Sequence, residues 1–190
     1  KKGFLPYRWN GYDEALLLYL LGLGSTTHPL PQETYTAWAS SYLWKKVYGI
    51  EYLYSGPLFT HQLSHLWIDF QGIRDAYMRD KDLDYFENTR RATQVQREYA
   101  IRNPMEFQGY GENCCGLSAC DGPGRKTCMV EGIDRRFFGY ISRGVPFGPD
   151  DGTITPCAVA ASLPFAPAIG LPPLDTMSNL AFAYQASGQF

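Results

Sequence analysis

The chain has 190 residues, with 17 Lys and Arg against 19 Asp and Glu, so its net charge is −2. This balance excludes the basic field by which proteins attract nucleic acid or an acidic membrane surface, and it favours a neutral partner. The length suits one ordinary domain or a piece of a larger one. Aromatic residues make up 15% of the chain. They are candidates for stacking on a ligand, although aromatic rings more often fill a core.

The beginning of the sequence shows neither a membrane span nor an export signal. The longest apolar run, Ala15 to Leu21, is too short for a bilayer, and the residues before it lack the apolar stretch and cleavage site of a signal peptide. Because the sequence opens almost directly into a motif, we expect an N-terminal portion of the same domain to be absent from it.

The first two predicted helices follow one another closely. Residues 12–23 are apolar nearly all round, which predicts an inner helix that is buried on every side. Pro31 suits the first turn of a second helix, and Glu33 lies at the positive end of that helix.

The second helix has the pattern of an outer helix. Tyr35, Trp38 and Tyr42 form one apolar stripe with polar residues between them. Gly49 follows a basic pair at residues 45–46, and this combination predicts that the helix ends there.

Two further helices are predicted from turn and capping signals. A turn at residues 55–57 opens a third helix that runs to about Ile68. Asp84 and Glu87 form the start of a capping box for a fourth helix, which ends before Pro104.

The composition changes between Gly109 and Asp151, where Gly, Pro, Cys and aromatic residues are frequent and the apolar residues show little helical periodicity. A loop region of this length in a compact domain is usually functional or disordered, and its aromatic content argues against disorder. We therefore predict a long structured loop region, with a short hairpin around Phe137 to Ile141.

The C-terminal part returns to helix. Thr155 and Pro156 predict the start of a short helix through Ser162, and prolines at 164, 167 and 172–173 divide two more helical stretches up to Tyr184. The fold class is mainly α, with inner and outer helices alternating as concentric helical layers require.

Polar and aromatic groups crowd the start of the first helix, in the run Trp9, Asn10, Gly11, Tyr12, Asp13, Glu14. The two acids could be ordinary first-turn residues that interact with the helix dipole. Glu14, however, runs straight into a buried apolar segment. Burial raises the pKa of a carboxyl group, and a general acid needs that shift to hold its proton near neutral pH.

His61, His65 and Asp69 recur every four residues and share one face of the third helix. This spacing could hold a metal, but no Glu follows the first His as in a zinc protease. The alternatives are a role in a substrate cleft and an ordinary place in the core with satisfied hydrogen bonds.

The loop region offers further acids, at Glu112, Asp121 and Asp151, with glycines that let the backbone approach a ligand. Turn formation by Asp-Gly is the simpler explanation for Asp121 and Asp151. Carboxyl groups and aromatic rings gathered in this way favour hydrolysis of a glycosidic bond by a carboxyl pair.

The five cysteines are odd in number and contain no C-x-x-C spacing, so a zinc site of that type is not predicted. Cys114 and Cys115 could pair with Cys120 or Cys128 in an oxidising compartment. A thiol mechanism using Cys114 or Cys115 with His61 is a further alternative, for which no orienting third group is apparent.

These motifs resemble the bacterial glycoamylase-like domain family over residues 3–174. The matching runs are W-N-G-Y-x-E-A-L-L-L-Y, T-H-P-L-P, G-P-L-F-T-H-Q-x-S-H-x-W-I-D-F, Y-F-E-N-x-R-R-A-T, Y-G-E-N-x-x-G-L-x-A-x-D-G-P-G and G-P-D-D-G-T-I-x-P. Members of this family and its relatives look like six-hairpin (α/α)6 toroids, and the relatives include endo-β-1,2-glucanases and the glucanase modules of cyclic β-glucan synthases. The resemblance implies that residues 1–190 are a single partial domain, about the later half of a toroid.

The resemblance also implies site residues. Glu14 would be the proton donor or its close neighbour, Glu112 the first choice for a second carboxylate, and Asp121 the next. The residues that would line a cleft for an oligo- or polysaccharide are Trp9, Asn10, Tyr12, His61, His65, Trp67, Tyr110 and Asp151. No metal or other cofactor is expected, and a periplasmic or cell-surface location in a bacterium is implied.

One departure from the family pattern is visible, because Cys115 stands where an aromatic residue is expected after the first cysteine of N-C-x-G-L. Sugar binding there could differ. The tail from Ser178 to Phe190 matches none of the motifs. The leading hypothesis is a hydrolase of a β-linked glucan, and the main alternative is a carbohydrate-binding protein without activity on the same scaffold.

Overall fold

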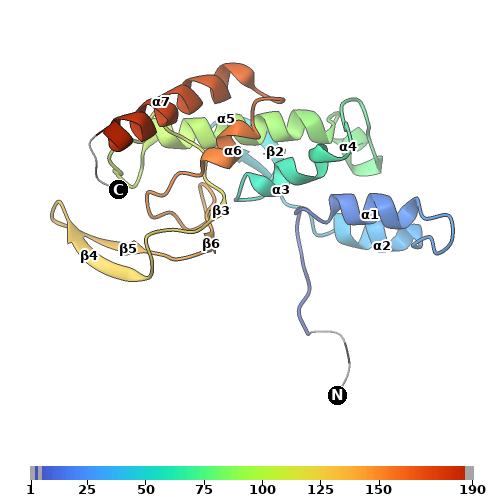
Figure 1. Cartoon of the computed structure of the whole chain (residues 1–190). Coiled ribbons are helices and arrows are strands. Elements are labelled where there is room, and N and C mark those ends of the chain that lie inside the picture. Colours follow the sequence, from blue (N-terminus) through green and yellow to red (C-terminus); the bar gives the residue numbers. More distant parts are fainter. Residues whose placement is uncertain (1–2, 4–5, 187–190) are drawn as a thin grey trace.

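The computed structural model describes residue 3 and residues 6–186, and these form a mainly helical body (Figure 1). The helices are α1 (Leu16–Leu23), α2 (Gln32–Ala39), α3 (Phe59–Gln62), the 3-10 helix η1 (Leu63–Leu66), α4 (Ala76–Asp80), α5 (Tyr85–Arg102), α6 (Pro156–Ala160) and α7 (Pro167–Ala186). The strands are β1 (Trp44–Val47), β2 (Ile50–Leu53), β3 (Ala119–Cys120), β4 (Lys126–Val130), β5 (Ile133–Phe137) and β6 (Ile141–Ser142). Within the described residues, no helix is long and apolar enough to cross a membrane.

α1 begins four residues later than predicted. The Asp13 side chain accepts a hydrogen bond from the backbone N–H of Ala15 at 2.8 Å, which holds residues 13–15 in a turn before the helix. The prediction of burial on every side was wrong for the part of the chain that the structure describes, because Leu18 and Leu21 are 63% and 61% exposed. α1 therefore presents an apolar face to solvent.

The second helix was predicted correctly at its start and wrongly at its end. It follows Pro31, with Glu33 in its first turn, but it ends at Ala39. Residues 44–47 instead pair in antiparallel register with residues 50–53. The turn between them has positive φ at Tyr48 and Gly49, so Gly49 serves a hairpin and not a helix end.

The third and fourth predicted helices are present. α3 starts beside Pro57 as expected, but it narrows to the 3-10 helix η1 after four residues, which moves later side chains off the α-helical face. α5 starts at the predicted cap, where the Asp84 carboxylate accepts from the N–H of Glu87 at 2.7 Å. Asn103 ends it in the left-handed conformation before Pro104.

Two predictions for the C-terminal half were wrong in detail. The principal hairpin of the loop region is β4–β5, whereas residues 137–141 mainly connect β5 to β6. α7 is one helix that continues through Pro172 and Pro173 where two stretches were predicted, although an interior proline lacks the N–H of a helical hydrogen bond and crowds the preceding turn. The predicted short helix after Thr155 is confirmed as α6.

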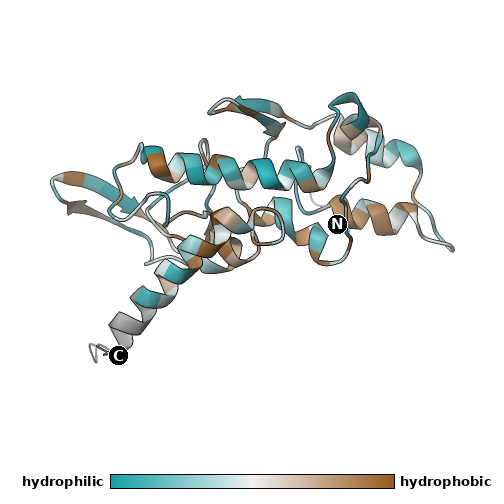
Figure 2. Cartoon of the chain, turned by 90° about the horizontal axis from the view of Figure 1, so that it is seen from above, coloured by the Kyte–Doolittle hydropathy of each residue, from teal (hydrophilic) through white to brown (hydrophobic). Residues whose placement is uncertain are grey.

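Among the described residues the core forms three clusters, and the smallest joins Tyr99 of α5 to Leu117 and Val145 of the loop region. One cluster lies between α1, α2 and residues 70–85, and a second joins the β1–β2 hairpin to α5 and α6. Both views place α1 and α2 at one end and the β4–β5 hairpin at the other (Figures 1 and 2). Figure 2 shows α1 as strongly hydrophobic and α5 as mostly hydrophilic. Several polar residues of α5 are nevertheless buried, namely Asn88, Thr89, Thr93 and Gln96.

Candidate active site

The buried polar face of α5 fixes the loop region to the start of α3. Gln96 accepts a hydrogen bond from the N–H of Leu117 at 2.9 Å and donates to the carbonyl of Gly56 at 3.2 Å. The hydroxyl of Ser118 accepts from the N–H of Phe59 at 3.0 Å. Residues 116–118 are therefore held against the first turn of α3, where helix N–H groups need partners.

The same loop also reaches the start of α6, because Thr155 donates its N–H to the carbonyl of Gly116 at 3.0 Å. A side chain at Gly116 would meet Val159 of α6 at 2.6 Å, so the close approach needs glycine. The loop thus joins the beginnings of two helices. Glu112 and Asp121, on either side of this fixed part, are both exposed to solvent.

Asp151 lies inside the protein, in an ion pair with Arg143. The guanidinium donates to both carboxylate oxygens, at 2.7 and 2.8 Å, and both side chains are fully buried. Burial alone would raise the pKa of Asp151, but hydrogen bonds from Arg143, Thr153 and Phe138 lower it to about 2. In this position Asp151 cannot contact a sugar without a rearrangement, and the sequence did not identify Arg143.

Asp150 binds two tyrosine hydroxyl groups. Tyr110 donates to Oδ1 at 2.8 Å and Tyr99 donates to Oδ2 at 2.9 Å, while the N–H of Gly152 also donates to Oδ1. Burial, followed by the charge of Asp150, raises the pKa of both tyrosines. The predicted cleft residue Tyr110 is therefore engaged with Asp150. The sequence signal for Asp150 was obscured because Asp-Asp-Gly reads as an ordinary turn.

His61 is 1% exposed and has partners on both ring nitrogens. Nε2 lies 3.2 Å from the carbonyl of Ser55, to which it donates, and Nδ1 lies 3.3 Å from the side-chain nitrogen of Asn88. Burial lowers the pKa of His61 to about 4, so the ring is neutral at neutral pH. It stabilises the junction of α3, α5 and the hairpin.

His65 is partly buried beside an apolar cavity. Its Nε2 lies 3.1 Å from the hydroxyl of Thr89, and Nδ1 has no partner among the described residues. Burial lowers its pKa to about 4 as well. Over the described part of the chain, no three His, Cys, Asp or Glu side chains gather as a metal site would require, so the metal alternative for His61, His65 and Asp69 gains no support.

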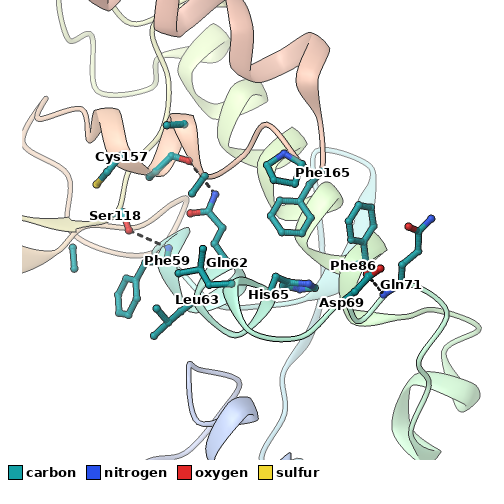
Figure 3. Close-up of a pocket in the computed structure, with 16 residues that line it drawn as sticks. Phe59, Gln62, Leu63, His65, Asp69, Gln71, Phe86, Ser118, Cys157 and Phe165 are labelled. Carbon is teal, nitrogen blue, oxygen red and sulfur yellow. Dashed lines mark hydrogen bonds between the residues drawn. The ribbon is translucent and has the colours of Figure 1, made fainter.

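That cavity has a volume of about 740 Å³ and lies between α3, η1 and α6. Figure 3 shows His65, Phe86 and Phe165 around it. The buried amide of Gln62, which also lines it, is satisfied by the carbonyl of Ala158 and the hydroxyl of Ser162. Aromatic rings and alanines make most of the lining apolar, while Nδ1 of His65, unpartnered within the described residues, and the side chains of Asp69 and Gln71 supply polar groups to it.

Tyr12 is buried in a cluster of aromatic rings. Its ring stacks on Tyr85 with centroids 5.7 Å apart and lies 5.2 Å from the ring of His61. Its hydroxyl has no partner within the described residues. Tyr12 therefore supports the packing at the start of α1 and does not face solvent.

The residues just before Tyr12 lie at a surface hollow. Trp9 is 73% exposed, and with Asn10 and Arg8 it lines a cavity of about 360 Å³ beside α1 and α2. Burial raises the pKa of Asp13, the carboxyl next to this hollow in sequence, and the charge of Glu14 adds to that rise. The pKa of Asp13 is therefore moved in the direction that a general acid needs, and Asp13 directly precedes the predicted Glu14.

The other predicted residues are exposed. Trp67 is 72% exposed at the end of η1. Glu112 forms an ion pair with Arg97 of α5. The structure therefore divides the predicted residues into those that are at least half-exposed and those that are held by internal contacts, and Tyr110 is both half-exposed and held by Asp150. The exposed or half-exposed members are Trp9, Asn10, Glu14, His65, Trp67, Glu112 and Asp121, whereas Tyr12, His61, Tyr110 and Asp151 are held by internal contacts.

All five cysteines are free, so none of the disulfide pairings considered from the sequence is formed. Burial raises the pKa of Cys114, and it raises that of Cys115 to about 11. A nucleophilic cysteine needs a lowered pKa. This direction disfavours the thiol alternative.

Comparison with known proteins places the chain in a family. The family model described as "Glycoamylase: Putative glucoamylase" matches residues 6–190. This match includes the C-terminal tail, which the sequence motifs did not cover.

Relatives with more specific descriptions match most of the chain. It is 25% identical over 182 residues to the exo beta-1,2-glucooligosaccharide sophorohydrolase (non-reducing end) of Parabacteroides distasonis, covering 83% of this chain and 23% of that protein. It is similar to the crystal structure of a "putative glucoamylase" from Bacteroides fragilis, with 33% identity and a TM-score of 0.73 over 90% of this chain and 39% of that one. The endo-beta-1,2-glucanase from Chitinophaga pinensis, in complex with sophorotriose and glucose, gives 30% identity and a TM-score of 0.72 over 90% and 39%. The chain spans less than half the length of each of these relatives.

Proposed function

The chain belongs to the glycoamylase family, and from that membership we propose that the protein is a glycoside hydrolase of a β-linked glucan, with β-1,2-glucan favoured. The observation that carries the proposal is the family match over residues 6–190, together with relatives described as acting on β-1,2-linked glucans. The near-zero net charge and the exposed aromatic rings agree with a neutral sugar chain as substrate.

The chemistry proposed is acid/base catalysis by carboxyl groups. Glycoside hydrolysis needs one carboxyl that holds a proton for the leaving oxygen and a second that is ionised. Burial raises the pKa of Asp13, so the pair Asp13 and Glu14 at the start of α1 is the proposed acid. Glu112 and Asp121, both exposed in the loop region, are the proposed candidates for the second carboxylate.

Substrate contact is proposed for the exposed members of the predicted set. Trp9 and Asn10 line the hollow beside α1, where an aromatic ring and an amide could bind one sugar unit. The buried members, Tyr12, His61 and Asp151, are proposed to hold the backbone around the cleft.

We also propose the larger context. α1, α3 and α6 would be inner helices of an (α/α)6 toroid, and their apolar surfaces, including exposed Leu18 and Leu21, would pack against the remainder of that domain. Residues 1–190 would be one partial domain of a protein in the bacterial periplasm or on the cell surface.

The test is product release by the full-length protein from soluble β-1,2-, β-1,3- and mixed-linkage glucans. We expect release from β-1,2-glucan, and a fall of about 10²- to 10⁴-fold in kcat for Glu14→Gln or Asp13→Asn, whichever is the acid. Glu51→Gln, an exposed acid on β2, is the control and should leave the rate unchanged. A chelator should have no effect. Binding of glucan without release under any condition would instead establish the non-catalytic alternative.

A further inference from the structure

A carboxylate and an exposed aromatic ring adjoin the same end of the short β3–β6 ladder. Ala119 pairs with Ser142 and Cys120 with Ile141, in antiparallel register. Asp121 directly follows Cys120, and Tyr140 directly precedes Ile141, so both residues leave the ladder at this pair. Tyr140 is 69% exposed, and Asp121 is exposed as well.

Both residues follow directly after a backbone carbonyl that binds Arg143. The guanidinium donates to the carbonyl of Cys120 at 2.7 Å, immediately before Asp121. It also donates to the carbonyl of Gly139 at 3.3 Å, immediately before Tyr140. One buried side chain therefore fixes the backbone from which both exposed side chains project.

The donors of Arg143 are fully used in this arrangement. Two go to Asp151, two to the carbonyl and sulfur of Cys120, and the last is shared by the carbonyls of residues 138 and 139. Gly122 lets the chain come this close, because a Cβ there would lie 2.2 Å from Nη2 of Arg143 and 2.5 Å from the carbonyl of Phe138. Such a set of contacts fixes direction as well as distance.

We propose that Arg143 is a positioning residue of the glucan site and that Tyr140 is a sugar-contacting residue presented with Asp121. The proposal rests on the proposed function. A carboxylate accepts hydrogen bonds from sugar hydroxyls, while an exposed ring covers the apolar C–H face of the same unit, so the pair suits a neutral polyhydroxyl chain. Arg143 itself, fully buried, acts through the backbone of these two residues.

The experiment measures kcat and KM on β-1,2-glucan for the full-length protein and its variants. Tyr140→Ala should raise KM about 10- to 100-fold with little change in kcat, and Tyr140→Phe should retain most of the binding. Arg143→Lys keeps the charge beside Asp151 but cannot span the carbonyls, so kcat/KM should fall by about 10- to 100-fold. The control Arg136→Lys removes a nearby guanidinium, which lies over the ring of Phe138, and should change neither constant.

A double variant separates positioning from stability. With Tyr140→Ala already present, Arg143→Lys should lower kcat/KM by a clearly smaller factor, because one of the two groups it orients is gone. The proposal would be overturned if Arg143→Lys lowered kcat/KM by the same factor with and without Tyr140→Ala. It would also be overturned if Arg143→Lys alone lowered the melting temperature but left kcat/KM within about twofold of wild type. Either result would leave Arg143 with a structural role. Wild-type protein that releases no product from any glucan would overturn the proposed function and this inference together, which distinguishes the two failures.

Discussion

Two regions around the candidate site are held in place by different kinds of contact. Near α1 and α2, the chain is fixed by stacked aromatic rings, and a single carboxylate, Asp75, accepts from the hydroxyls of Tyr35 and Tyr85. In the loop region, the chain is fixed by the ion pair of Arg143 and Asp151 and its bonds to backbone carbonyls. The first region depends mainly on buried apolar area and the second on directed polar contacts.

The difference has consequences for how each region tolerates change. Aromatic packing spreads its contribution over many contacts, so the loss of one hydroxyl removes a small part of it. A buried ion pair concentrates its contribution in two side chains, and the loss of either leaves an unpaired charge without water. The loop region should therefore be the more sensitive of the two to single substitutions.

The largest expected effect is that of Arg143→Met. It leaves Asp151 buried without its partner, and breaking a buried pair in this way costs about 3 to 5 kcal/mol of the free energy of unfolding. Urea unfolding of the full-length protein measures the loss. The double variant Arg143→Met with Asp151→Leu should recover part of it, because no charge then remains buried. A single variant that loses less than about 1 kcal/mol would mean that the two regions do not differ as described.

Acid should affect the two buried histidines and the ion pair of Asp151 in separate pH windows. Burial lowers the pKa of His61 and His65 from 6.5 to about 4, so the folded state favours the neutral rings. Their stabilising effect is complete above pH 6.5 and is lost as pH falls towards 4, by roughly 3 kcal/mol for His61. The lowered pKa of Asp151 affects stability further down, between about pH 3.8 and 2.

Histidine variants test which side chains cause the loss of stability between pH 6.5 and 4. His61→Gln should reduce by about half the slope of unfolding free energy against pH between 6.5 and 4, because His65 still titrates. His28→Gln, at an exposed position, is the matched control and should leave the slope as it is. An unchanged slope in His61→Gln would show that His61 is accessible to protons in the folded protein.

Features that depend on neighbouring residues could be predicted from the sequence, whereas features that depend on distant contacts could not. Signals confined to a few neighbouring residues held, as in the cap of α5 at Asp84 and its end before Pro104. The β1–β2 hairpin was missed, because Lys45 and Lys46 follow an apolar helical stripe and strand pairing depends on the turn at Gly49. The predicted end of a helix thus became a hairpin.

The residues of the candidate site also differ in whether local sequence or distant partners determine their role. Local composition identified Glu14, Glu112 and Asp121 as acids in unusual surroundings, and the structure leaves all three at least partly exposed. Local composition could not identify Arg143 or Asp150, because their importance comes from partners far away in the sequence, such as Cys120 for Arg143. For the same reason, no pattern in the sequence could show that His61 and Asp151 are buried.

The smallest expected effect concerns single hydroxyls of the aromatic region, where Tyr85 and Tyr12 form a matched pair. Tyr85 donates to Asp75 at 2.8 Å and lies 3.2 Å from the hydroxyl of Tyr42, whereas the hydroxyl of Tyr12 has no partner within the described residues. Tyr85→Phe should therefore lower the free energy of unfolding by about 1 to 2 kcal/mol, because it leaves other buried groups unpaired. Tyr12→Phe should be neutral or slightly stabilising, since it removes a hydroxyl that lost its water on folding and gained no bond. Both rings keep their stacking, so urea unfolding of the two variants measures the polar part of this region separately from its packing. Equal losses would mean that Tyr12 has a partner outside the described residues, and the aromatic region would then depend on directed contacts as the loop region does.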